Sequence, residues 1–202
     1  MITSQKEGNA ILAYTQKTTY TRQQISDSLL HLLQTQDFNT ITVKQVVDPI
    51  HVDRSTFYRY FEDKYDLLAQ TEQQVLDEID TLRLDLHVES NQLADHSQEA
   101  LLIIADFFQS HAPVLRGLFS PHSLPTFETK MTRQLSVRFN QIYEPPRTSQ
   151  VKLLRDTLIT IVITVLKNWV LHPADLSMPE TLLLLKSALD HGIIPTLNEK
   201  LA

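Results

Sequence analysis

The chain has 202 residues, no cysteine, only three glycines and a formal net charge of −6. Without cysteine it has no disulfide, no thiolate metal ligand and no thiol nucleophile. Three glycines leave little for hairpin turns or phosphate-binding loops, which need glycine where the backbone takes a positive φ. We therefore expect an all-α fold with no cofactor, in a chain long enough to bury a large core.

The acidic excess argues against a protein that coats nucleic acid non-specifically. The charges are unevenly distributed, since residues 71–202 hold 11 basic and 16 acidic side chains. Residues 23–70 hold four basic and seven acidic side chains. Any attraction to phosphate must therefore depend on where a few cations point.

Residues 1–20 carry no apolar period and are expected to form a flexible polar arm, without the apolar core of a signal peptide. The longest uncharged apolar stretch, residues 157–166, is too short to span a membrane. These features predict a cytoplasmic protein with no membrane partner.

Three short helices are predicted next. The first starts at Thr21 and ends before residues 37–40, with an apolar stripe of Ile25, Leu29, Leu32 and Leu33. Thr42 is expected to cap the second, which Pro49 ends. After a turn through His51, the third begins near Asp53 and buries Phe57 and Phe61.

The remaining chain predicts longer helices over residues 64–88, 101–108, 127–143, 150–171 and 178–197. Proline and serine punctuate residues 112–125, which we expect to be a connection. The last helix has Ser177 as its N-cap, with Glu180 at the capping-box offset.

Three short helices with a tight turn before the third indicate a helix-turn-helix, whose third helix would enter the DNA major groove. Its outer face carries Arg54, Ser55, Tyr58 and Arg59, which suit base edges and phosphates. A solvated amphipathic helix would show the same pattern, so this face alone leaves the choice open.

The motif Arg-Ser-Thr-Phe-Tyr-x-x-Phe-x-x-Lys over residues 54–64, at this distance from Thr42-Val43, resembles the DNA-binding domain of the TetR/AcrR transcriptional regulators. The resemblance covers residues 21–68. The remainder is similar in helix order only, with some likeness to the group of these repressors common in Firmicutes. The resemblance implies a DNA-binding domain over residues 21–66 and a larger helical regulatory and dimerisation domain over residues 67–202.

The resemblance also implies the residues that contact DNA through phosphates or base edges: Thr42, Lys44, Arg54, Ser55, Thr56, Tyr58, Arg59, Tyr60 and Lys64. Tyr60 could instead pack against the first helix, and Lys64 could be a solvated first-turn residue. His51 replaces the family's usual turn glycine, and histidine tolerates a left-handed backbone better than most residues.

Regulators of this kind respond to a ligand by changing the spacing of two recognition helices. The last two helices are expected to form a dimer seam that includes Ile161, Val165, Trp169, Leu182, Leu185 and Leu189. A small apolar or aromatic effector is expected against the middle helices, at Phe107, Phe108, His111, Phe119, Met131, Phe139 and Tyr143. Core packing explains most of these residues equally well.

The sequence therefore predicts a ligand-responsive, homodimeric repressor that binds a palindromic operator in double-stranded DNA. No metal-ligand spacing or catalytic motif is present, so an enzyme is not expected. The alternative is a helical adaptor that keeps the fold but acts through a protein partner.

Overall fold

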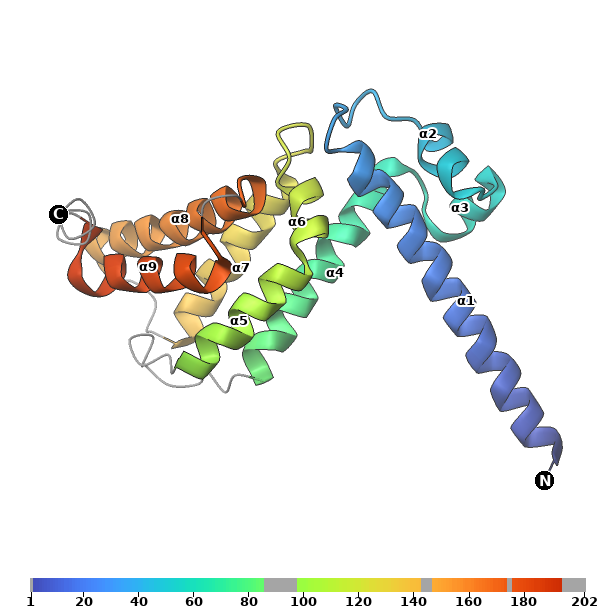
Figure 1. The fold of residues 1–202 in the computed structure, drawn as a ribbon, viewed down its shortest axis with the longest axis horizontal. Coiled ribbons are helices and arrows are strands. Elements are labelled where there is room, and N and C mark those ends of the chain that lie inside the picture. The colour runs from blue at the N-terminus through green and yellow to red at the C-terminus, as the bar shows by residue number, and fades with distance from the viewer. Residues whose placement is uncertain (1, 86–97, 143–146, 174–175, 194–202) are drawn as a thin grey trace. The chain divides into compact units, whose positions relative to one another are not determined.

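A computed structural model describes the backbone of residues 2–85, 98–142, 147–173 and 176–193. Within these ranges every regular element is a helix, which confirms the predicted all-α class (Figure 1). The chain divides into two compact units, Met1–Gln74 and Val75–Ala202. Each unit is described by itself.

The first unit contains α1 (Ile2–Leu32), α2 (Val43–Val47), a 3₁₀ turn η1 (Asp48–Ile50), α3 (Arg54–Tyr60) and the first half of α4 (Lys64–Asp85). Helix α1 starts at Ile2, so residues 2–20 are helical where a flexible polar arm was expected. The sequence from Ile2 to Leu32 contains no proline, and nothing in its backbone stops a helix that begins early. Residues 2–20 lack an apolar period, but this did not exclude a helix, because a polar segment can still extend one.

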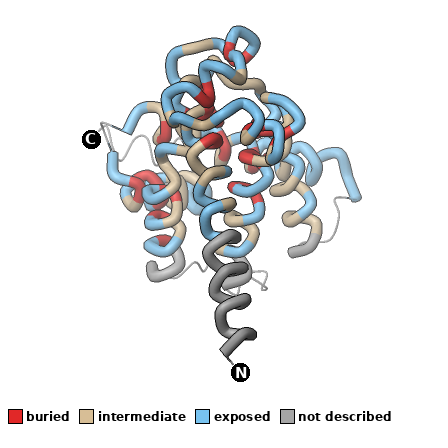
Figure 2. Tube along the Cα trace, turned by 90° about the vertical axis from the view of Figure 1, so that its right-hand side faces the viewer, coloured by how far each residue is buried: buried red, intermediate tan, exposed pale blue. Residues whose placement is uncertain are grey.

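The core of the first unit is made of apolar side chains at helical spacing (Figure 2). Phe57 is fully buried and Phe61 is 3% exposed, and their ring centroids lie 5.5 Å apart. They lie among buried residues of α1, of the α1–α2 connection, of α2 and of α4: Ile25, Leu29, Leu33, Phe38, Ile41, Val46, Val47, Leu67 and Leu68. This core fixes which face of the short helix α3 is turned outward.

The turn between α2 and α3 matches the sequence prediction. Helix α2 ends at Val47, and Pro49 lies in the 3₁₀ turn that follows. His51 adopts the left-handed conformation, with φ 54° and ψ 38°, at the position where the family usually has glycine. Asp53 has the extended backbone of an N-cap, although its side chain makes no capping bond to α3.

The second unit contains the rest of α4 with α5 (Gln98–Ser110), α6 (Ala112–Leu118), α7 (Thr126–Ile142), α8 (Ser149–Leu171) and α9 (Met178–His191). Helix α5 packs on α9, α7 packs on α8, and α6 contacts α8. Helix α6 lies in the stretch expected to be a connection. Its Pro113 stands in the first turn, where proline removes no intrahelical hydrogen bond, so this proline favours a helix start.

The predicted capping box at the start of α9 is present. The Ser177 hydroxyl accepts a hydrogen bond from the Glu180 backbone N–H, and the Glu180 carboxylate accepts from the Ser177 backbone N–H at 2.8 Å. Hydrogen bonds from the Ser177 hydroxyl and backbone lower the pKa of Glu180. The contribution of the Glu180 carboxylate to the cap is therefore retained above the ordinary pKa of a glutamate and is lost as the pH falls through the lowered value, whereas the backbone N–H bond to the Ser177 hydroxyl does not titrate.

Among the described helices, none combines the length and apolar character needed to cross a bilayer.

We predict that Phe57→Ala lowers the stability of the first unit by about 3–5 kcal/mol, because it empties a fully buried aromatic site. Tyr58→Ala is the matched control, since the neighbouring Tyr58 side chain is 58% exposed and its loss should cost within about 0.5 kcal/mol. Thermal melts followed by circular dichroism measure both. Equal losses in the two variants would contradict the assignment of the buried face.

Candidate nucleic-acid interface

Helix α3 presents a polar face opposite its buried phenylalanine. Arg54, Ser55, Tyr58 and Arg59 are exposed, while Phe57 is fully buried. The Tyr58 ring stands edge-on to Phe57 at a centroid distance of 5.3 Å, so a buried ring supports an exposed one. The helix therefore offers two guanidinium groups and two hydroxyls on the side away from the core, which are donors for base edges and phosphates.

The other two predicted contacts on α3 are less accessible. Thr56 and Tyr60 are half-buried, and the Tyr60 ring lies 6.4 Å from that of Phe61. The sequence left open that Tyr60 packs against the first helix, and the ring contact found here is with Phe61.

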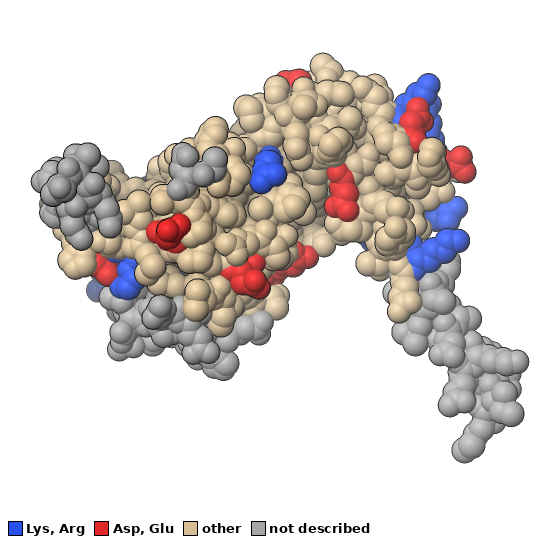
Figure 3. All heavy atoms as spheres, viewed as in Figure 1, with Lys and Arg blue, Asp and Glu red and all other residues tan. Residues whose placement is uncertain are grey.

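Lys44 on α2 is exposed and adds a third cation. Figure 3 shows basic side chains over α2 and α3, with acidic ones among them. Arg22 of α1 is also exposed, but its guanidinium donates to the side-chain carbonyl oxygen of Gln70 at 2.5 Å and lies 5.7 Å from the Phe61 ring centroid. The first unit therefore exposes few cations, and the guanidinium of Arg22 is already bonded to Gln70.

Thr42 caps α2, as predicted, but both of its donors are already used. Its hydroxyl donates to the Gln45 side-chain carbonyl at 2.8 Å, and its backbone N–H donates to the same oxygen at 2.9 Å. The Gln45 backbone N–H returns a bond to the Thr42 hydroxyl at 3.3 Å, which completes a capping box. A phosphate contact from Thr42 would have to displace Gln45, a residue that the Thr-x-x-Gln spacing could have identified.

Lys64, predicted to contact a phosphate, is bonded within its own domain. Its ammonium group donates to the backbone carbonyls of Phe38, Asn39 and Ile41, at 2.8, 2.9 and 2.8 Å. An ammonium has three N–H donors, so none is left over for a phosphate in this arrangement. No sequence spacing could have indicated this, because the acceptors are backbone groups more than 20 residues away.

The predicted effector residues divide into three groups. Phe108, Phe119 and Met131 are buried in the second unit, and the Phe119 ring packs edge-on against Phe127 at 5.1 Å. Phe107, His111 and Phe139 are half-buried. Tyr143 lies outside the described residues.

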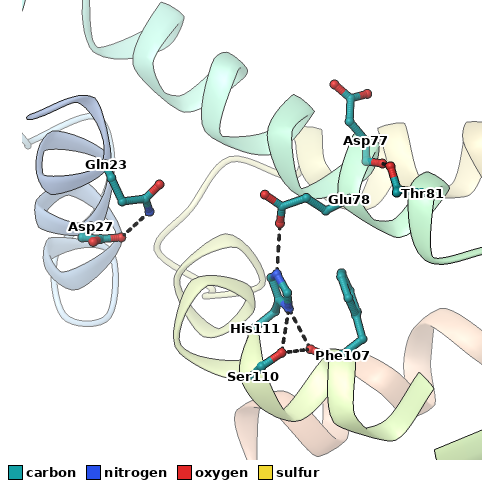
Figure 4. Close-up of polar contacts among 8 residues, drawn as sticks. All are labelled: Gln23, Asp27, Asp77, Glu78, Thr81, Phe107, Ser110 and His111. Atoms are coloured by element: carbon teal, nitrogen blue, oxygen red, sulfur yellow. Dashed lines mark hydrogen bonds and ion pairs between the residues drawn. The ribbon is translucent and has the colours of Figure 1, made fainter. Parts of the chain in front are cut away.

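His111 has three polar neighbours (Figure 4). Its Nε2 lies 3.0 Å from a carboxylate oxygen of Glu78 on α4, and its Nδ1 lies 2.8 Å from the Phe107 carbonyl and 3.0 Å from the Ser110 hydroxyl. The ring also stacks on Phe107 with centroids 4.0 Å apart. His111 thus links α4 to the end of α5.

Leu182, predicted for the dimer seam, is only 7% exposed and packs within its own chain. Ile161, Val165, Trp169 and Leu185 are half-buried, and Leu189 is 43% exposed. The Trp169 indole donates to the Leu176 carbonyl at 3.0 Å. The other exposed apolar side chains of α8 and α9 are Val151, Leu153, Leu154, Leu183 and Leu184.

In the first unit, a buried phenylalanine holds a short helix and leaves the basic, hydroxyl-bearing face of that helix exposed. This arrangement defines a helix-turn-helix DNA-binding protein. Residues 25–71 match the family model of bacterial regulatory proteins, tetR family. Residues 25–71 thus carry the helix-turn-helix DNA-binding domain of the tetR family of bacterial regulatory proteins.

One solved structure similar to this chain is the TetR transcriptional regulator from Streptococcus agalactiae 2603V. The comparison covers 89% of this chain and 98% of the other, at 21% identity and a TM-score of 0.57. At this identity the likeness concerns the fold. No curated protein matches the sequence.

The exposed cations predict a shallow salt dependence of DNA binding. If Lys44, Arg54 and Arg59 are the cations that neutralise phosphates, log K should fall with log[salt] with a slope of about −3 for each subunit bound, at ~0.9 for each phosphate. Fluorescence-anisotropy titrations of a duplex over a range of salt concentrations measure this slope. A slope of roughly −5 or steeper per subunit would mean that further cations, such as Lys17, Arg22 or Lys64, also reach the backbone.

Proposed function

We propose that this regulator is a homodimeric repressor that leaves a palindromic operator when a small apolar or aromatic molecule binds its second unit. The observation that carries the proposal is the exposed face of α3, where Arg54, Ser55, Tyr58 and Arg59 present two guanidinium groups and two hydroxyls. Guanidinium groups can bind guanine bidentately, and a tyrosine hydroxyl can donate to phosphate.

A dimer is supported by the apolar surface of the last two helices. Helices α8 and α9 lie side by side and antiparallel (Figure 1). Leu153 and Leu154 on α8 are 68% and 70% exposed, and Leu183 and Leu189 on α9 are 51% and 43% exposed. Large leucines in such numbers on one helix pair are unusual for a monomer surface and are typical of the core of a subunit interface.

An effector that acts on the second unit is supported by the aromatic side chains of its middle helices. Phe107 and Phe139 are half-buried, and Phe107 stacks on His111. His111 holds α4 through Glu78, and α4 is also the helix whose first turns belong to the DNA-binding unit. A ligand that alters the second unit around α4 could therefore change the spacing of two recognition helices in a dimer.

We predict that Arg54→Ala combined with Tyr58→Ala weakens operator binding by at least roughly a hundredfold, because each lost base or phosphate contact costs about 1–3 kcal/mol. The duplex is obtained by selecting bound DNA from a random pool. Circular dichroism should be unchanged, since both side chains are exposed. Lys152→Ala on α8 removes one exposed cation from the second unit and serves as the control.

Enrichment of a palindrome by the wild-type protein, with loss of binding in the double variant only, is the expected result. If no duplex is enriched, the DNA-binding proposal fails and a protein partner becomes the better hypothesis. If Lys152→Ala weakens binding of the duplex equally, binding depends on the overall charge of the protein and not on α3.

We also predict that Leu154→Glu combined with Leu189→Glu converts a dimer into a monomer in sedimentation velocity at micromolar concentration, because charges buried without partners oppose association. Leu102→Glu on α5 is the matched control, since this leucine is 54% exposed on a helix outside the proposed seam. A wild-type monomer, or a dimer that survives both changes, would place the subunit contact elsewhere or exclude it.

A further inference from the structure

Lys64, the first residue of α4, has an ammonium group enclosed by its own domain. Besides the three carbonyls that accept its hydrogen bonds, its Nζ lies 4.9 Å from the Phe38 ring centroid and 5.6 Å from that of Tyr65. The side chain is half-buried. The ammonium group of Lys64 is thus surrounded by polar and aromatic groups of its own domain, whereas the Lys44 side chain is exposed.

The three carbonyls belong to the turn between α1 and α2. Within this turn the N–H groups of residues 39–41 are already bonded, Asn39 to the Asp37 carboxylate, Thr40 to the Asp37 carbonyl and Ile41 to the Phe38 carbonyl. Its carbonyls converge on one point next to buried Phe38 and Ile41. Burial beside apolar side chains makes an unpaired carbonyl costly, and the ammonium group pairs the carbonyls of Asn39 and Ile41 and adds a second bond to that of Phe38.

The position of the turn sets the start of α2. Ile41, whose carbonyl binds Lys64, directly precedes Thr42, the N-cap residue of that helix. Lys44 follows on the first turn of α2. Lys64 therefore ties the start of α4 to the start of α2 across more than 20 residues of chain, which include the whole of α3.

We propose that Lys64 is a positioning residue that fixes α2 relative to α4 and does not neutralise a DNA phosphate. This inference rests on the DNA-binding function only for its effect on affinity, since the bonds themselves form without DNA. Geometry separates the two roles, because a compact ammonium can direct three donors at converging carbonyls, whereas the planar guanidinium of arginine cannot. Arginine would serve a phosphate at least as well.

The first test uses the wild-type protein without DNA. Brief treatment with limiting acetic anhydride, followed by peptide mass spectrometry, compares the acetylation rates of Lys64 and Lys44. An ammonium that donates three hydrogen bonds to its own domain is shielded from the reagent, so Lys64 should react at least about tenfold more slowly than Lys44. Equal rates would overturn the proposal.

The second test compares Lys64→Arg with Lys64→Met and Lys44→Met. We expect Lys64→Arg and Lys64→Met both to lower the melting temperature and to weaken binding of the selected duplex by roughly tenfold at every salt concentration, with the salt slope unchanged. Lys44→Met should leave the melting temperature unchanged and make the slope shallower by about 1 per subunit.

Full binding by Lys64→Arg, or a shallower slope in Lys64→Met at unchanged melting temperature, would identify a phosphate contact and overturn the proposal. If Lys64→Met does not fold, the arginine variant and the acetylation rates still distinguish a positioning residue from a phosphate contact. Slow acetylation in a wild-type protein that retains no duplex would leave the positioning role intact and refute the proposed DNA-binding function.

Discussion

The burial of Phe57 is the constraint on which the DNA-binding unit depends. Helix α3 has seven residues, and a helix of that length does not persist in water on its own. It is held because Phe57 and Phe61 lie four residues apart and enter a core built by α1, α2 and α4. The same anchoring turns Arg54 and Tyr58 outward, so that one apolar contact determines both the stability of the helix and the face that it offers to DNA.

In the second unit, polar links join α4 to its neighbours. Helix α4 is joined to α5 by Glu78 and His111, and to α7 by the ion pair of Asp80 with Arg138. The Gln134 side chain of α7 also donates to the Leu76 carbonyl of α4 at 3.2 Å. Polar links of this kind exchange partners more easily than a packed core rearranges, because a ligand or water can take over each bond.

Sequence periodicity predicted the helices and the core because both depend on local patterns. The stripe from Ile25 to Leu33, the cap at Ser177 and the left-handed His51 all follow from residues close together in the chain. The roles of Lys64 and of Leu182 depend instead on contacts made by distant segments. A lysine is equally suited to phosphate and to carbonyl oxygen, and a leucine in a run of four can face either side of its helix. The sequence therefore predicted the fold well and the direction of individual side chains less well.

Because Lys64 is bonded within its own domain, the DNA-binding unit has fewer available cations than its composition indicates. Residues 23–70 hold four basic side chains against seven acidic ones, and one of the four, the half-buried Lys64, donates to three backbone carbonyls of its own domain. A surface with so few cations attracts DNA weakly at long range, so binding must rely on short-range contacts from α3 that require correct placement. Two such subunits would bind well only when both recognition helices match the operator spacing at once. A modest shift in that spacing would then suffice for release, because little non-specific attraction remains to hold the protein on DNA.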